Sequence, residues 1–136
     1  MQVRVDDPRE EAVYRLAPDP SSLPGARRLA REVVEGWMSE EQCAKLDMAV
    51  TETISNAVRH SGASTEIVLT LTRKEGYLCV RVTDEGDGLV PRPGAIATEP
   101  GAGFGLFLVE QLTRRWGMTR ENEKTRVWFE LDADAA

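Results

Sequence analysis

Apolar residues repeat along the chain with two different periods, and the change of period separates the expected helices from the expected strands. Through residues 23–60 they recur every three or four positions, the spacing of one face of an α-helix. In residues 66–84 and 126–131 they alternate with polar residues, as in a strand with one buried face. We therefore expect helices and strands to share one α/β domain.

These patterns and their boundary residues predict three helices and five strands. The helices are expected at Leu23–Met38, Ser39–His60 and Gly103–Trp116. The strands are expected at Val13–Ala17, Glu66–Thr72, Tyr77–Asp84, Met118–Asn122 and Arg126–Leu131. Ser39 and Gln42 have the spacing of a capping box, in which each side chain binds the other residue's amide. Gly117 is expected to end the third helix, and the first strand to lie at a sheet edge.

The order of these elements favours one fold class. It predicts a two-layer α/β sandwich, in which a mixed, mainly antiparallel sheet carries all its helices on one face. A single domain is expected over residues 11–131, with a flexible N-terminus at 1–10 and a flexible tail at 132–136.

Composition and charge narrow the classes of function. The net charge is −6 and the pI about 4.9, which argues against direct binding of nucleic acid. No run of 18 apolar residues predicts a membrane span, and the first residues lack the apolar core of a secretory signal. Cys43 and Cys79 are expected to be small core residues in a reducing compartment. We therefore expect a cytoplasmic protein.

Three polar residues interrupt the second helix at a regular spacing. Glu52, Asn56 and His60 follow one another at intervals of four, so they lie along one side of the helix. The amide oxygen of Asn56 could bind Mg2+, and the carboxylate of Glu52 could deprotonate a nucleophile. The alternative is a solvated helix face with no chemical role. His60 would contact phosphate or the Mg2+ shell, or would cap the helix end.

The strand before the long loop ends in an acidic residue on its apolar side. Asp84 shares the parity of Leu78, Val80 and Val82, so its carboxylate is expected to face the core. A carboxylate there is unfavourable unless something binds it, and the exocyclic amine of adenine is a suitable donor. Gly86 and Gly88 would let the backbone approach a flat ring closely. Read alone, these residues also fit an ordinary turn.

The long loop ends in glycines that precede the third helix. Gly101, Gly103 and Gly105 would leave backbone amides free at the helix N-terminus, where they can bind phosphate. Read alone, they also fit a plain entry into a helix. Residues 89–102 form a loop long enough to be a lid over a ligand. Because neither a P-loop nor a dinucleotide-binding motif occurs, the three features together predict a different kind of site for a magnesium-bound adenine nucleotide.

These three boxes, their order and the lid between the last two resemble the GHKL ATPase superfamily of gyrase, MutL and the histidine kinases, whose domain has the Bergerat fold. The phrase at 56–61, Asn-Ala-Val-Arg-His-Ser, and the ending at 125–128, Thr-Arg-Val-Trp, more narrowly resemble RsbW-like anti-sigma factor serine/threonine kinases of actinobacteria. The likeness extends over about residues 10–131.

The resemblance implies a role for each motif. Glu52 would be the general base, Asn56 the Mg2+ ligand and Asp84 the adenine contact. The segment Gly101–Gly105, which includes Phe104, would hold the phosphates of ATP together with Leu106. Phe104 is expected to pack under the lid. Thr125 would support the adenine side.

The resemblance also implies partners. The chain would phosphorylate a serine of an anti-anti-sigma factor of the STAS type, and would sequester a sigma factor. It would form a homodimer, for which the predicted edge strand Val13–Ala17 offers a surface. Two other functions stay open, an ATP-binding regulatory module without kinase activity and an ATP hydrolase.

Overall fold

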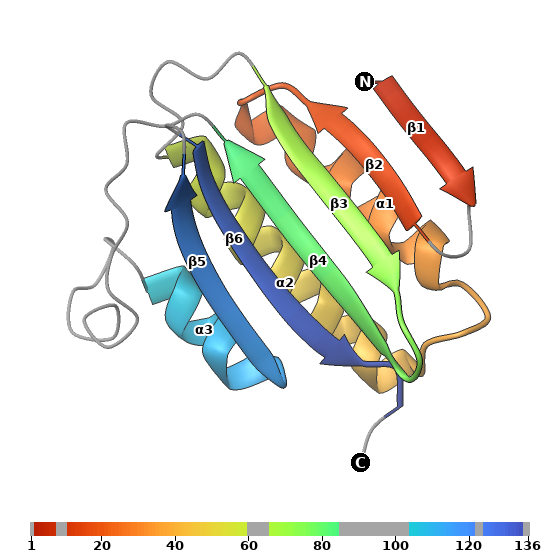
Figure 1. Ribbon diagram of the computed structural model, residues 1–136. Coiled ribbons are helices and arrows are strands. Elements are labelled where there is room, and N and C mark those ends of the chain that lie inside the picture. Colours follow the sequence, from red (N-terminus) through yellow and green to blue (C-terminus); the bar gives the residue numbers. More distant parts are fainter. Residues whose placement is uncertain (1, 8–10, 60–65, 85–103, 122–123, 135–136) are drawn as a thin grey trace.

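Six strands form one sheet, and three α-helices cover one of its faces in the described part of the chain (Figure 1). The computed structural model describes residues 2–7, 11–59, 66–84, 104–121 and 124–134. The strands are β1 (Gln2–Asp7), β2 (Glu11–Leu16), β3 (Ile67–Arg73), β4 (Tyr77–Asp84), β5 (Arg115–Glu121) and β6 (Lys124–Asp132). The helices are α1 (Leu23–Val34), α2 (Glu40–Arg59) and α3 (Phe104–Leu112), and the short 3-10 helix η1 (Pro20–Ser22) precedes α1.

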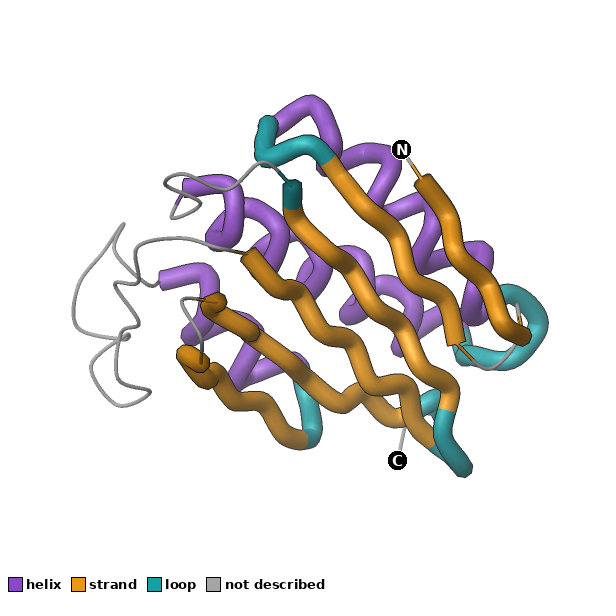
Figure 2. Tube along the Cα trace, turned by 45° about the horizontal axis from the view of Figure 1, so that its top comes forward, coloured by secondary structure: helices purple, strands orange, loops and turns teal. Residues whose placement is uncertain are grey.

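The two-layer sandwich predicted from the sequence is confirmed. The strand order is β1-β2-β3-β4-β6-β5, and each of these neighbouring pairs is antiparallel. The helices lie together behind the sheet, and its other face carries no helix of the described chain (Figure 2). Because side chains alternate along a strand, every second residue of β2, β3, β4 and β6 faces the helices and is buried.

The core forms where these inward residues meet the apolar sides of α1 and α2. Leu46, Val50 and Ile54 of α2 are almost fully buried against the sheet. Leu71 and Phe129, from β3 and β6, are among the buried side chains of the sheet that face the helices. The prediction of one core made by the 3.6-residue and 2-residue patterns is therefore confirmed for the described residues.

The start of α2 is held by half of the predicted capping box. The Ser39 hydroxyl accepts a hydrogen bond from the Gln42 amide at 3.2 Å, and Glu40 and Glu41 lie in the first turn. The Gln42 side chain does not reach back to Ser39. It is buried and donates to the backbone carbonyl of Asp132 at 2.9 Å, because β6 ends directly over this turn.

The two ends of the chain are more ordered than the sequence predicts. Residues 2–7 form β1, which pairs with β2, so the predicted edge strand around Val13–Leu16 lies one strand inside the sheet. Alternation of Val3 and Val5 with polar residues is the sequence signal for β1. At the other end β6 continues to Asp132, and Ala133 is buried with its amide 2.9 Å from the Gly76 carbonyl.

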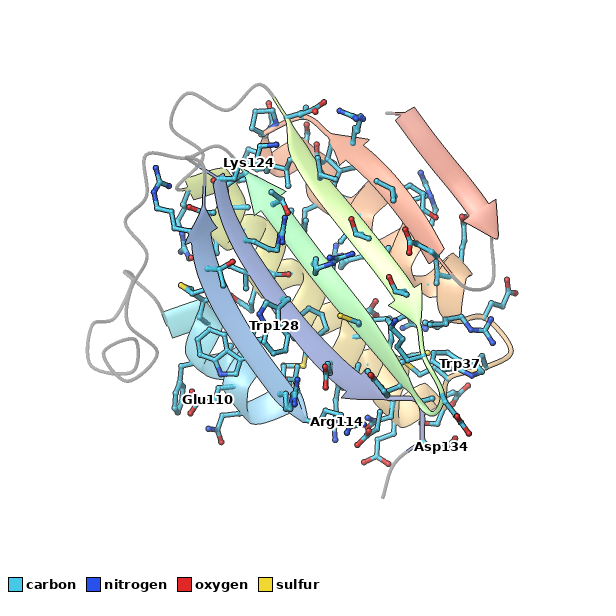
Figure 3. All side chains as sticks on the ribbon, in the orientation of Figure 1. Trp37, Glu110, Arg114, Lys124, Trp128 and Asp134 are labelled. Carbon is cyan, nitrogen blue, oxygen red and sulfur yellow. The ribbon has the colours of Figure 1, made fainter. Side chains whose placement is uncertain are left out.

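The third helix is shorter than predicted. It ends at Leu112, and the next residues turn into β5, in which Gly117 pairs directly with Trp128. The Trp128 indole lies so close that a Cβ atom on Gly117 would be 2.7 Å from its Cζ2 atom. Figure 3 labels the Trp128 side chain on the sheet. Gly117 is therefore a strand glycine that makes room for an aromatic ring, and not a helix stop.

The two cysteines are free thiols, and only Cys43 is the small core residue that the sequence predicts for both. Cys43 is buried on α2, whereas Cys79 is only half-buried on β4 and points to the open side of the sheet. Burial raises the pKa of both thiols.

None of the helices within the described ranges is long and apolar enough to cross a membrane.

Candidate functional site

The candidate site residues on described elements gather at one end of the sandwich. Helix α2 runs behind β4 and β6, and its C-terminal end lies near the point where β4 ends and β6 begins (Figure 1). Glu52 and Asn56 are in the last two turns of α2, Asp84 is the last residue of β4 and Thr125 the second residue of β6. Helix α3 packs against α2 on the side of β5 and β6.

Asn56 carries a buried acceptor without a partner. Its side chain is only 5% exposed, and its Oδ1 atom makes no hydrogen bond within the described residues. Leaving a buried polar atom unpaired costs about 1–3 kcal/mol. An amide oxygen in this state fits the role of a ligand to a hard cation such as Mg2+. This single residue can supply only one ligand, so phosphate oxygens and water would have to complete the shell.

Glu52 lies one helical turn before Asn56, on the same side of α2. Its side chain is half-buried, and it makes no hydrogen bond or ion pair with any residue that the structure describes. A carboxylate that the fold does not use for packing or pairing is available for proton transfer. The sequence predicts this adjacency from the four-residue spacing.

Asp84 faces the helix layer, as its parity in the sequence predicts. It is 4% exposed and shares the inward side of β4 with the buried residues Val80 and Val82. Its cross-strand neighbour on β6 is Thr125, which is 8% exposed and faces the same layer. Two buried polar side chains thus stand together on an otherwise apolar face, where they could also contact a polar ligand.

A further residue at this end is absent from the sequence-based prediction. Arg120 on β5 pairs with Thr125, and its Nη1 atom donates to the Thr125 hydroxyl at 3.0 Å. Asp84, Thr125 and Arg120 therefore form a row across β4, β6 and β5. The sequence predicts the connection of the last hairpin at residues 123–125, which leaves Thr125 outside the strand. In the structure β6 already begins at Lys124, so Thr125 pairs with Arg120.

The remaining predicted site residues lie on α3 or outside the described part of the chain. Leu106 is fully buried in the core, so its side chain is a packing residue of α3. Phe104 and Gly105 lie in the first turn of α3, and the structure describes only their backbone. Outside the described residues lie Gly86, Gly88, Gly101, Gly103, His60 and the predicted lid at 89–102.

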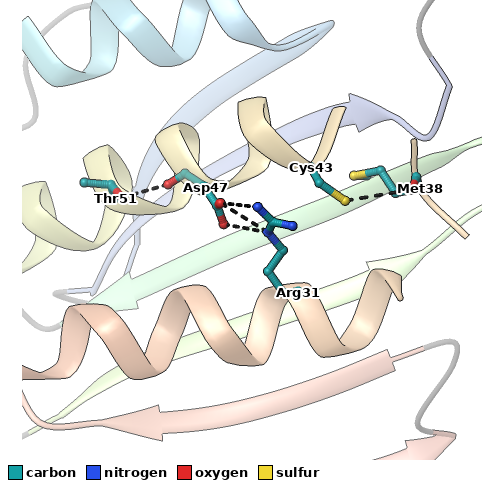
Figure 4. A network of polar contacts seen from close by, with 5 residues as sticks. All are labelled: Arg31, Met38, Cys43, Asp47 and Thr51. Atoms are coloured by element: carbon teal, nitrogen blue, oxygen red, sulfur yellow. Dashed lines mark hydrogen bonds and ion pairs between the residues drawn. The ribbon is translucent and has the colours of Figure 1, made fainter. Parts of the chain in front are cut away.

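Helix α2 is held laterally by a contact with α1. The Arg31 guanidinium donates to both carboxylate oxygens of Asp47, at 2.7 and 3.1 Å (Figure 4). These hydrogen bonds raise the pKa of Arg31. The Thr51 hydroxyl donates to the Asp47 carbonyl at 2.7 Å, and the Thr53 hydroxyl to the Ala49 carbonyl at 2.9 Å. Both threonine hydroxyls thus bond to carbonyls of their own helix in the turns around Glu52.

Comparison with known proteins identifies the family. A family model described as a histidine kinase-like ATPase domain matches residues 16–131. No curated protein sequence matches the chain significantly.

Three solved structures share the fold. One contains the RsbU and RsbW domains of Rv1364c from Mycobacterium tuberculosis, with a TM-score of 0.70 and 19% identity over 90% of this chain and 32% of that one. The second is the histidine kinase domain of the EL346 blue-light activated histidine kinase from Erythrobacter litoralis, with a TM-score of 0.54 and 19% identity over 84% of this chain and 60% of that one. The third is the Acinetobacter baumannii histidine kinase AdeS, with a TM-score of 0.52 and 13% identity over 89% of this chain and 67% of that one.

This chain spans about a third of the first of these structures, so the likeness concerns a domain and its fold. The family model matches most of the chain, residues 16–131, and an ATPase domain implies ATP as the ligand. It agrees with the GHKL resemblance and with the gathering of Glu52, Asn56 and Asp84 at one end of the sandwich. The chain belongs to the family of histidine kinase-like ATPase domains.

Proposed function

We propose that this domain is an ATP-dependent protein kinase that phosphorylates a serine of an anti-anti-sigma factor and also sequesters a sigma factor. The observation that carries the enzymatic part is the pair on α2. Among the described residues, the buried amide oxygen of Asn56 has no hydrogen-bond partner, and it lies one turn from a Glu52 carboxylate that pairs with none of them either. A cation ligand beside a free base is the arrangement that phosphoryl transfer requires.

The adenine end of the proposed site is the row on the sheet. Asp84 accepts a hydrogen bond from the exocyclic amine of the base, and Thr125 supports the same edge of the ring. Both side chains are buried and come from neighbouring strands, which holds them in fixed relative positions. The glycines Gly86 and Gly88 follow Asp84 directly and would border the ring.

The phosphate end of the proposed site lies between α2 and α3. Asn56 would help to hold a Mg2+ ion, which would offset the negative charge of the phosphates. The segment Gly101–Gly105 leads into the N-terminus of α3, where backbone amides and the helix dipole favour phosphate. Asn56 and α3 would thus hold the chain of phosphates from opposite sides.

Glu52 is the proposed general base. It accepts the proton of the incoming serine hydroxyl while the serine oxygen bonds to the γ-phosphorus and the bond from that phosphorus to ADP breaks. The products are phosphoserine and ADP, and the proton stays on Glu52 until it is released to water. The half-buried position of Glu52 leaves it accessible to a protein substrate.

The proposed partners are a sigma factor and a STAS-type anti-anti-sigma factor, in the cytoplasm, and the proposed assembly is a homodimer. Their support is the resemblance in sequence and the shared fold with a structure that contains an RsbW domain. Because β1 lies outside β2, the strand at Val13–Leu16 is not the edge on which such a dimer would form.

Calorimetry with Mg-ADP and a transfer assay with labelled ATP test the proposal. Purified STAS-domain proteins from the same organism serve as candidate acceptors. Glu52→Gln is expected to abolish label transfer but keep ADP affinity, and Asp84→Asn to weaken ADP binding about 10- to 100-fold, the size of one charged hydrogen bond. Glu41→Gln, an exposed glutamate at the other end of α2, is the matched control.

Each outcome has a distinct meaning. Absence of ADP binding by the unmodified chain would reject the nucleotide site. Full transfer by Glu52→Gln would reject Glu52 as the base. Label recovered only as free phosphate would favour the hydrolase, and ADP binding without transfer or hydrolysis would favour the regulatory module.

A further inference from the structure

In the row Asp84–Thr125–Arg120, the proposed function gives a binding role to Asp84 and Thr125 only. We propose that Arg120 is a specificity-determining residue, which orients the Thr125 hydroxyl as a hydrogen-bond donor and so makes the site select 6-aminopurines over 6-oxopurines. The proposal rests on the nucleotide site described above and goes beyond it, since that site assigns no role to β5.

The geometry of the row is set by the backbone. In the register of the sheet Asp84 is opposite Thr125, and Thr125 is opposite Arg120. All three have the inward parity, because the alternate positions Gly117 and Trp128 lie on the open face of the sheet. The Arg120 Nη1 atom is 3.0 Å from the Thr125 Oγ1 atom. Directly opposite side chains are near enough to interact across a sheet.

The donor and acceptor chemistry of these groups gives the row a direction. A guanidinium has only donors and stays charged, so the Thr125 oxygen must accept from Arg120. Accepting from a cation makes the hydroxyl a stronger donor and weakens its second acceptor lone pair, and its one proton is directed away from Arg120. No hydrogen bond from this proton to a described residue is present. The site end of the row therefore presents a carboxylate acceptor next to a hydroxyl donor.

This pair of groups matches one class of purine edge. In adenine the 6-amino group donates and the neighbouring N1 accepts, so the amine meets Asp84 and N1 meets the Thr125 proton, directly or through a water. In hypoxanthine and guanine the 6-oxo group accepts and N1–H donates, so both contacts are reversed. Without Arg120 the Thr125 oxygen is an unweakened acceptor for N1–H, which relieves one of the two mismatches.

The test compares the affinity of ADP with that of inosine diphosphate, measured by calorimetry with Mg2+. The chain is expected to bind ADP more tightly, and Arg120→Ala to reduce the ADP:IDP affinity ratio about three- to tenfold, the effect of one neutral hydrogen bond. Arg120→Lys, which keeps a charged donor, should restore most of the ratio. Arg126→Ala is the matched control, because Arg126 follows Thr125 directly but is exposed on the opposite face.

A double-mutant cycle separates orientation from a general effect of charge or stability. In a Thr125→Val background there is no hydroxyl to orient, so Arg120→Ala should leave the ADP:IDP ratio unchanged. Urea unfolding verifies that each variant is folded. An unchanged ratio in Arg120→Ala, or an equal loss with and without the Thr125 hydroxyl, would overturn the role of Arg120 while leaving the ADP site intact. Absence of ADP binding in the unmodified chain would instead overturn the proposed function.

Discussion

Asn56, Asp84 and Thr125 are polar residues in places where the fold would otherwise bury apolar ones. Each is less than a tenth exposed, and each faces the layer between the sheet and the helices. Burying such groups is unfavourable unless they are hydrogen-bonded, and the Oδ1 atom of Asn56 has no partner in the part of the chain that the structure describes. For Asn56 we infer a position that suits a ligand at some expense in stability, which is the pattern of a binding site built into a core.

At the same scale, Gly117→Ala is expected to lower the free energy of unfolding by about 1–3 kcal/mol. The added Cβ would meet three atoms of the Trp128 ring at 2.7–2.9 Å, and a rigid ring on a packed sheet cannot yield without moving its neighbours. Urea denaturation measures the change. The same substitution in a Trp128→Leu background should be nearly neutral, and Thr119→Ala, exposed on the same strand, is the control. Equal losses in both backgrounds would contradict the steric explanation.

Helix α2 is the element that joins the site to the rest of the fold. Its N-terminus is tied to the C-terminal end of β6, because Gln42 donates to the Asp132 carbonyl and the Ser39 amide donates to the Ala133 carbonyl at 2.9 Å. Its middle is linked to α1 by the Arg31–Asp47 ion pair. This pair is largely exposed and contributes about 0–1 kcal/mol, so packing of the apolar side provides most of the stability.

Ser39→Ala is expected to destabilise the domain by about 0.5–2 kcal/mol, because it removes the side-chain acceptor for the Gln42 amide at the start of α2. Thermal or urea unfolding followed by circular dichroism measures the change. Ser39→Asp keeps an accepting oxygen and should stay close to the unmodified chain. If Ser39→Asp were as unstable as Ser39→Ala, the hydroxyl would act in some other way than as a cap.

The whole molecule has a sheet with one covered face and two outer strands, β1 and β5. The covered face holds the core and the candidate site. The order of the strands puts β4 and β6 next to each other although 39 residues lie between Asp84 and Lys124 in the sequence. That long-range pairing is what brings Asp84 beside Thr125, so this part of the site depends on the pairing of β4 with β6.

Removal of residues 1–7 is expected to make β2 an outer strand and so to increase self-association. The backbone groups of β2 that pair with β1 would be left open for another chain. Sedimentation at several concentrations measures the effect, and removal of residues 134–136, which follow the last buried residue, is the matched control. Equal association of the two shortened chains would show that β1 does not protect this edge.

Local patterns in the sequence were sufficient to predict the orientation of some candidate site residues. The alternation that ends at Asp84 predicts its inward orientation, and the spacing of Glu52 and Asn56 predicts their shared side of α2; both follow from the geometry of a single strand or helix. The same reasoning failed at Gly117, because a glycine after an apolar run has the same appearance whether it ends a helix or admits an aromatic ring from another strand. It also failed at the chain ends, where order comes from pairing with β2 and with the Gly76 turn.

The sequence by itself determined the class of fold, the family and the residues of α2 and β4 that carry the candidate chemistry, because each depends on periodicity or on a short motif. Only the tertiary structure decided that Arg120 belongs beside Thr125, that Gln42 binds the end of β6 and that Asn56 has no partner among the described residues. The physical reason is that hydrogen-bond partners distant in sequence depend on strand register and on helix position. No window of neighbouring residues contains that information.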